Sequence, residues 1–220
     1  MGIHIMPPLF ELVIKPRPPL PLTYYPETGV ADANGPRRIF VSETWADIHD
    51  TASGVSLWGN PYVIVQADDS TNKWRELGRG IICFNSAGRP SDIQSAKVRL
   101  YVSSRTNQFA TATSMGLYLS TPTDPASIAI GDYNKAGSVL ASGTHLALSA
   151  GAYDVPLGWV EFPLNAAGLA AIVDGVSKFG IRLAWDTTNS PPAWVSLKIG
   201  AVYCSGIGGG ANKPQLVVNY

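Results

Sequence analysis

The residues of this chain that could do chemistry are few and scattered. Its three histidines, His4, His49 and His145, do not have the spacing of a metal site. Glu76 and Glu161 lie in runs that predict strands, and a glycosidase needs two carboxylates that face each other. Because acidic side chains of strands usually face solvent, we expect neither an enzyme nor a cofactor.

Two common catalytic motifs are absent from the sequence. It contains no Gly-x-Ser-x-Gly run that could form the turn of a serine nucleophile. The glycine-rich run at residues 206–210 precedes a proline and a predicted strand, whereas a phosphate-binding loop leads into a helix. We therefore expect this run to be a loop tip.

One acidic loop is a weak candidate for a calcium site. Asp68, Asp69 and Asn72 offer the oxygen ligands that calcium prefers. They do not follow the spacing of an EF-hand, and Asp and Asn side chains of turns commonly bond to their own backbone. A turn is the favoured interpretation, and we predict no metal site.

The two cysteines, Cys83 and Cys204, both fall in predicted strands. Sparse cysteines outside small secreted domains rarely form a disulfide framework, and a buried free cysteine packs as a small apolar side chain. We favour free thiols, although the sequence leaves a disulfide between the two open.

Aromatic side chains offer a different chemistry, because they stack against ligands and anchor protein partners. Most of the six tryptophans are expected in the core. Trp58 and Trp194 lie beside turns, so we predict that they form a surface pair, and Tyr101 lies on the polar face of an alternating strand. These three are the candidate glycan-binding or interface aromatics.

A succession of short strands must position these residues. The clearest lies at residues 95–103, where apolar and polar side chains alternate. Residues 179–185, 195–199 and 213–220 also read as strands, and Asn165 is placed to cap a helix over residues 166–173. With 22 Gly and 17 Pro between such runs, the chain reads as an all-β sandwich of about ten strands with one or two short helices.

Residues 1–36 differ from the domain expected at residues 37–220. Recurrent prolines exclude a helix or a central strand, so we predict an extended arm. The arm is too apolar for a solvated linker, and it wraps either its own domain or a neighbouring subunit. Its candidate anchoring residues are Leu9, Phe10, Leu12, Val13, Ile14, Tyr24 and Tyr25.

The charge of the chain narrows the classes of partner. Its 16 basic and 16 acidic residues cancel, which argues against nucleic acid as a partner. No run is apolar enough to predict a membrane span, and the first residues lack the basic start of a signal peptide. We expect synthesis in a cytoplasm and no membrane partner.

Several stretches resemble DNRLRE-type domains, which are jelly-roll β-sandwich modules related to carbohydrate-binding modules. Two of them resemble the opening of that domain, namely Arg79-Gly80-Ile81-Ile82-Cys83-Phe84-Asn85 and Ile93-Gln94-Ser95-Ala96-Lys97-Val98-Arg99-Leu100-Tyr101-Val102. Residues 45–50, 162–172 and 213–220 are similar to the branch found in phage structural proteins. The resemblance covers residues 38–220, and it departs from the family at Asn85, where aspartate is usual.

The resemblance implies a jelly-roll sandwich and a non-enzymatic virion structural protein of a tailed phage. Such a decoration, head-fibre, neck or tail-associated subunit would assemble in the host cytoplasm, anchored through its arm to other virion proteins and to further copies of itself, as in a trimer. The alternative is a carbohydrate-binding module of a surface or fibre protein that contacts a host glycan. A second alternative is an extracellular filament subunit in which residues 9–14 donate a strand to the next copy.

Overall fold

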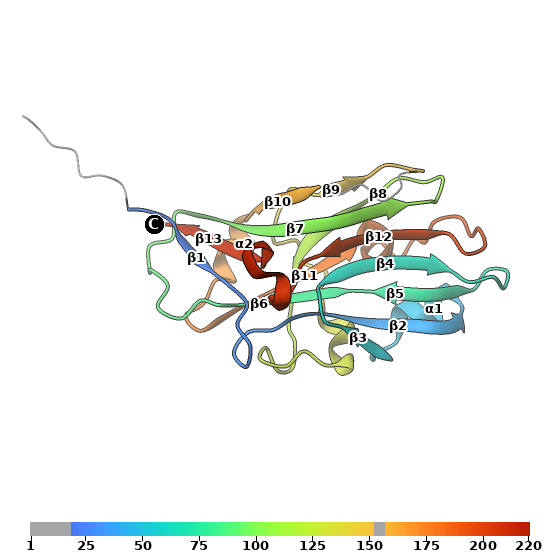
Figure 1. Cartoon of the computed structure of the whole chain (residues 1–220), viewed down its shortest axis with the longest axis horizontal. Helices are drawn as coiled ribbons and strands as arrows, with labels where there is room; N and C mark the ends of the chain where they lie inside the picture. Colours follow the sequence, from blue (N-terminus) through green and yellow to red (C-terminus); the bar gives the residue numbers. More distant parts are fainter. Residues whose placement is uncertain (1–18, 152–156) are drawn as a thin grey trace, which may run out of the picture.

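The longest strand of the structure, β7 (Ser95–Asn107), follows the alternation seen in the sequence. Ala96, Val98 and Leu100 point into the core, while Lys97 and Arg99 alternate with them on the outer side. The computed structural model describes residues 19–151 and 157–220, and it shows β7 as the long green strand between β12 and β10 of an all-β sandwich (Figure 1). The predicted fold class is therefore confirmed.

The described residues form thirteen strands, more than the ten expected. They also form short α-helices and 3₁₀ helices. Besides β7, the strands are β1 (Leu22–Tyr24), β2 (Ala33–Glu43), β3 (Ser56–Trp58), β4 (Tyr62–Ala67), β5 (Trp74–Gly78), β6 (Gly80–Asn85), β8 (Thr113–Leu119), β9 (Leu146–Leu148), β10 (Gly158–Pro163), β11 (Val176–Leu183), β12 (Ile199–Cys204) and β13 (Gln215–Asn219). The helices are α1 (Trp45–Asp50), α2 (Ala166–Ala170), α3 (Ala184–Thr187), η1 (Ile130–Lys135) and η2 (Ile207–Asn212).

The strand pairing has the nested order of a jelly roll. β4 pairs with β12, β6 with β11, β7 with β10, and β8 with β9, all antiparallel. Further pairing joins these into a first sheet with the order β4-β12-β7-β10 and a second with the order β6-β11-β8-β9. Two such four-stranded sheets are what a jelly roll requires. The remaining strands extend this frame.

Part of the predicted arm belongs to the sheets. β1 pairs with β13, with Leu22 opposite Val218, and β2 already begins at Ala33. β2 also joins the two sheets, because its start pairs with β6 and its middle pairs with β5. The expected boundary between residues 36 and 37 thus falls inside β2, and residues 1–18 lie outside the described residues.

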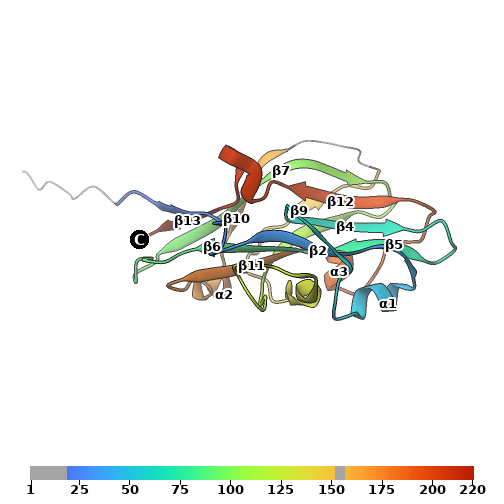
Figure 2. The same ribbon diagram turned by 60° about the horizontal axis from the view of Figure 1, so that its bottom comes forward.

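The predicted helix cap at Asn165 is present, because its side chain accepts the amide of Gly168 in α2. Thr44 Oγ1 caps α1 in the same way by accepting the amide of Asp47. α2 is shorter than the helix expected over residues 166–173. Figure 2 shows α1 and α2 on the side of the molecule where β6 and β11 lie. No helix of the described residues is long and apolar enough to cross a membrane.

The strand expected at residues 195–199 is wrong. Leu197 has a left-handed backbone with φ of 58°, which interrupts an extended run. The strand of this region is β12, which starts only at Ile199. Its second residue, Gly200, is required by packing, because a Cβ atom there would lie 2.6 Å from the Trp185 ring.

Candidate functional site

Five aromatic side chains, each from a different strand, lie on the outer face of the first sheet, and we call them the aromatic band. From one edge of the sheet to the other they are Trp58 of β3, Tyr62 of β4, Tyr203 of β12, Tyr101 of β7 and Trp159 of β10. β2 and β5 lie between β3 and β4 and contribute no aromatic ring to this row. The band therefore runs across the strands.

The rings of the band contact one another in two groups. The centroids of Trp58 and Tyr62 lie 5.8 Å apart, and Tyr62 stacks on Tyr203 at 5.8 Å with only 5° between the ring planes. At the other end, Tyr101 meets Trp159 edge to face at 5.7 Å. These spacings are typical of favourable aromatic pairs.

Glycines let the Tyr62 ring of the band lie close against the sheet. A Cβ atom at Gly35 would lie 2.6 Å from the Tyr62 ring, and one at Gly78 would lie 3.1 Å from it. Any larger residue at either position would push the ring away from the strands. Tyr62 is only 1% exposed, so the glycines of β2 and β5 shape the buried support beneath the exposed rings of the band.

An arginine and a carboxylate lie beneath the first tryptophan, and we call Arg37, Tyr62 and Glu76 the Glu76 cluster. The Arg37 guanidinium lies 4.8 Å from the centre of the Trp58 ring and 3.1 Å from Glu76 Oε1. The same oxygen accepts a 2.6 Å hydrogen bond from the Tyr62 hydroxyl. Burial raises the pKa of the Glu76 carboxyl, although its two partners work against the rise.

The second tryptophan repeats this arrangement nearer the surface. The Arg99 guanidinium lies 4.7 Å from the centre of the Trp159 ring, and its Nε lies 3.0 Å from Glu161 Oε1. Lys97 Nζ donates to the other Glu161 oxygen at 2.8 Å. This hydrogen bond lowers the pKa of Glu161. Each end of the band therefore carries a tryptophan, an arginine and a glutamate.

The two carboxylates are poorly arranged for catalysis. Glu76 and Glu161 belong to the opposite ends of the band, and each is already bound to an arginine. A general acid must hold a proton near neutral pH, whereas the Glu161 pKa is lowered. What this face offers is a set of fixed aromatic planes with charged groups beside them.

A different arginine–carboxylate cluster is buried, and we call Arg79, Arg182 and Asp186 the Asp186 cluster. Arg79 donates to both Asp186 oxygens, at 3.0 and 2.7 Å, and Arg182 Nε donates to one of them. Burial opposes a charge on Asp186, but the two guanidinium groups hold the pKa of its carboxyl below its usual value. Asp186 is only 1% exposed.

The Asp186 cluster fastens four elements together. Arg79 donates to the carbonyl of His49 in α1 at 2.9 Å and to that of Tyr133 in η1 at 3.4 Å. Asp186 belongs to α3, and Arg182 comes from β11. Because Arg79 and Asp186 are only 3% and 1% exposed and Arg182 only 9%, we assign this cluster a structural role.

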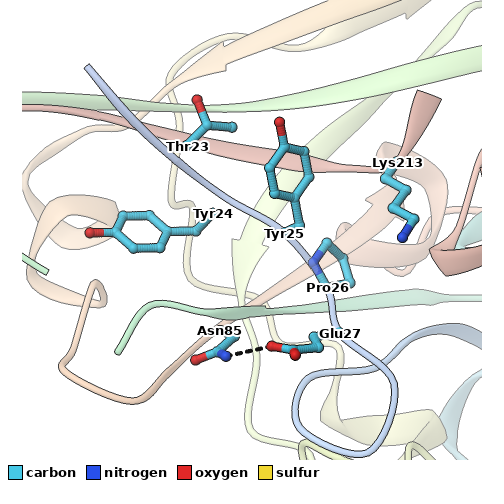
Figure 3. A pocket seen from close by; sticks show the side chains of 7 residues that line it. All are labelled: Thr23, Tyr24, Tyr25, Pro26, Glu27, Asn85 and Lys213. Carbon is cyan, nitrogen blue, oxygen red and sulfur yellow. Dashed lines mark hydrogen bonds between the residues drawn. The ribbon is translucent and has the colours of Figure 1, made fainter. Parts of the chain in front are cut away.

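Among the candidate anchoring residues of the arm, the structure describes Tyr24 and Tyr25, which lie at the edge of the body. Figure 3 shows their rings pointing in different directions beside a hollow of about 350 Å³, which Glu27, Asn85 and Lys213 also line. Asn85 Nδ2 donates to Glu27 Oε2 at 2.6 Å, a bond that aspartate at position 85 could not make. Leu9, Phe10, Leu12, Val13 and Ile14 lie outside the described residues.

The loop proposed for calcium is a hydrogen-bonded turn between β4 and β5. Asp68 Oδ1 accepts the amide of Ser70 at 3.0 Å, and Asn72 adopts φ of 57°. Asp69 Oδ1 accepts a hydrogen bond from the Ser70 hydroxyl. Across residues 19–151 and 157–220, no three His, Cys, Asp or Glu side chains are grouped to hold a metal ion.

The remaining candidate residues are two tryptophans and two cysteines, which differ in exposure. Trp58 is 42% exposed, as expected of a surface tryptophan. Trp194 instead packs partly against the core, and its Nε1 donates to the Lys73 carbonyl at 3.1 Å. Cys83 and Cys204 are buried free thiols, and burial raises the pKa of each to about 12.

Tyr62, Tyr203 and Trp159 are the band residues that sequence reasoning did not single out. In β10, Trp159 lies on the face opposite the buried Phe162, so the alternation of the strand indicates that Trp159 points outward. The alternation does not indicate which aromatic ring Trp159 contacts. The pairing of Trp159 with Tyr101 comes from the register of β10 against β7.

In the comparisons with known proteins, no protein-family model matches this chain and no curated protein is similar to it.

Proposed function

We propose that this chain is a non-enzymatic virion structural protein of a tailed phage, such as a decoration, head-fibre, neck or tail-associated subunit. The support is the resemblance of residues 38–220 to DNRLRE-type domains, the similarity of residues 45–50, 162–172 and 213–220 to the branch found in phage structural proteins, and the jelly-roll pairing of the strands. The zero net charge suits a subunit whose partners are proteins. Assembly in the host cytoplasm and association with further copies of itself belong to this proposal.

The position of β1 is the observation that carries the proposal. Its pairing with β13 attaches the chain after Pro21 firmly to one end of the sandwich, close to the last strand (Figure 1). α1 lies toward the opposite end. An apolar segment joined to the body at one end can anchor it there and leave the rest displayed.

Deleting residues 1–18 tests the anchoring role. The body retains β1 and every core strand, so we expect it to stay folded and to lose most of its incorporation into particles. Incorporation is measured by gel analysis of purified particles from cells that supply the truncated protein. A matched control is Val195→Ala at the far end of the body. Undiminished incorporation of the truncated, folded protein would contradict the proposal.

The aromatic band favours a second function, the binding of an extended saccharide chain. Sugar rings have apolar faces that stack on aromatic rings, and their hydroxyls bond to groups such as Arg37 and Glu161. From β3 to β10 the sheet order is β3-β2-β5-β4-β12-β7-β10, and steps of about 4.8 Å give a span of roughly 29 Å. This length suits several sugar units laid across the strands.

Native gel electrophoresis tests this function with soluble polysaccharides cast in the gel. Xyloglucan, galactomannan, hydroxyethyl cellulose, laminarin and polygalacturonate are the probes. We expect retardation by at least one of them, reduced by Trp58→Ala or by Trp159→Ala and kept by Tyr25→Ala, an exposed aromatic outside the band. Migration unaffected by every probe, or equal retardation of all variants, would contradict saccharide binding.

A further inference from the structure

A hollow of about 300 Å³ opens on the second sheet, and we call it the β8–β11 hollow. It lies between the end of β8, the start of β11 and the residues that follow α2. Its lining is mostly aliphatic, with one cation at the side. The lining residues are Leu119, Ser120, Thr121, Ala171, Val173, Val176 and Lys178.

Apolar side chains around this hollow are open to water. Val173 is 44% exposed, and Val139 is 57% exposed. Val139 is next to Leu119, which lines the hollow, because the Val139 carbonyl accepts the amide of Leu119 at 2.8 Å. Exposed apolar side chains that gather in this way often mark a surface that another segment or a partner covers.

We propose that residues 9–14 of the same chain occupy the β8–β11 hollow in the free subunit. This segment reads Leu-Phe-Glu-Leu-Val-Ile, so it can place apolar side chains in the hollow. Its single charge, Glu11, is complementary to Lys178. No carboxylate of residues 19–151 or 157–220 forms an ion pair with Lys178.

The hollow is close to the point where the arm joins the body. The Tyr25 carbonyl accepts the amide of Asn85 at 3.1 Å, and Asn85 is paired with Val176 of the hollow. Two strand spacings therefore separate Tyr25 from Val176, roughly 10 Å. From Leu22 to Tyr25 the chain covers about another 10 Å, which limits the distance from Leu22 to the hollow to roughly 20 Å.

The linker can cover this distance. Eight residue steps connect Ile14 to Leu22, and proline-rich chain in the polyproline conformation advances about 3.1 Å per residue, or roughly 25 Å in all. A segment tethered at this range has an effective concentration in the millimolar range for a site on its own body. This tether favours the same chain over a second copy as the source of the segment.

The inference goes beyond the anchoring role, because it concerns the subunit before assembly. While residues 9–14 lie in the hollow, they are unavailable to a neighbouring protein. Incorporation into a particle would then exchange one apolar contact for another. The proposal about the free subunit can be tested on purified protein, whether or not the protein belongs to a virion.

Engineered cysteines give the test. Leu12→Cys is combined with Val173→Cys at the hollow, or with Val195→Cys as the matched control, and the proteins are oxidised with copper phenanthroline. Val173 and Val195 are both 44% exposed, and the native thiols at Cys83 and Cys204 are buried. Val195 lies beside Trp194, which bonds to Lys73 in the turn between β4 and β5.

Docking in the same chain predicts an intramolecular disulfide in the Val173→Cys protein, seen by peptide mass analysis of the monomer band. We expect its yield to exceed that of the Val195→Cys control at least fivefold. Disulfide-linked dimers as the main product would overturn the proposal in favour of a second copy. Equal yields in the two proteins, or no cross-link in either, would overturn docking altogether.

Discussion

The two arginine–carboxylate clusters of this molecule use the same chemical groups in opposite surroundings. In the Asp186 cluster, two guanidinium groups surround a carboxylate that is 1% exposed, and their remaining N–H groups bond to carbonyls of α1, η1 and α3. In the Glu76 cluster, one arginine pairs with one carboxylate and lies under an exposed tryptophan. The first cluster holds helices and sheet together in the interior, whereas the second supports an exposed aromatic ring.

The difference lies in what each arginine contacts besides its carboxylate. Arg79 is surrounded by backbone carbonyls and by the buried Tyr133 ring, so it has no surface left for a partner. Arg37 lies against Trp58, whose ring is 42% exposed. An ion pair beneath an exposed aromatic ring fixes the position of that ring without closing the site. We infer that stability depends chiefly on the first cluster and recognition on the second.

The largest expected effect is from Asp186→Asn. This change leaves two buried guanidinium groups without a counter-charge, and breaking a buried pair in this way typically costs about 3–5 kcal/mol. We expect the free energy of unfolding in urea to fall by that amount. A loss near that of an average surface substitution would mean that the cluster does not hold the helices to the sheet.

Glu76→Gln should have a smaller effect. The amide oxygen can still accept the hydrogen bond from the Tyr62 hydroxyl, and Arg37 is close enough to solvent to be partly hydrated. We expect a loss of about 1–2 kcal/mol in the same urea titration, as for one hydrogen bond to a charged group. If Glu76→Gln destabilised the protein as strongly as Asp186→Asn, the contrast between the clusters would fail.

The two carboxylates should also respond to pH in opposite directions. The folded-state pKa of Asp186 is lowered, so its contribution is present above about pH 4 and is lost on further acidification. The folded-state pKa of Glu76 is raised, so its contribution is full below about pH 4 and is lost as the pH rises.

Urea titrations between pH 3 and 7 check this contrast. The difference in unfolding free energy between the wild type and Asp186→Asn should shrink as the pH falls. The difference between the wild type and Glu76→Gln should grow over the same change, because proton uptake by Glu76 then favours the folded state. Parallel changes in the two differences would show that the surroundings of the clusters are not opposite.

Local patterns predicted the frame of this fold but not its sites. The alternation of residues 95–103 and the cap at Asn165 depend on neighbouring residues, and the structure has both of them. Arg79 and Asp186 are 107 positions apart, so their pairing depends on how the sheets close. No nearby residue signals such a contact.

The aromatic band escaped prediction for the same reason. Trp58 was expected at the surface, but its neighbours Tyr62 and Tyr203 come from strands that meet only through the sheet order. A one-residue shift of β10 against β7 would move Trp159 away from Tyr101. Leu197 shows a different limit, since its left-handed backbone cannot be read from an apolar, alternating run.

The central claim, that the aromatic band serves recognition and not stability, is tested most directly on the variant Trp58→Ala/Trp159→Ala. Its urea unfolding and its migration in polysaccharide gels are measured on one preparation. We predict a loss of stability of about 1 kcal/mol per site or less, as for an exposed cation–π contact, together with loss of the retardation that the wild type shows. A stability loss as large as that of Asp186→Asn, or unchanged retardation, would contradict the claim.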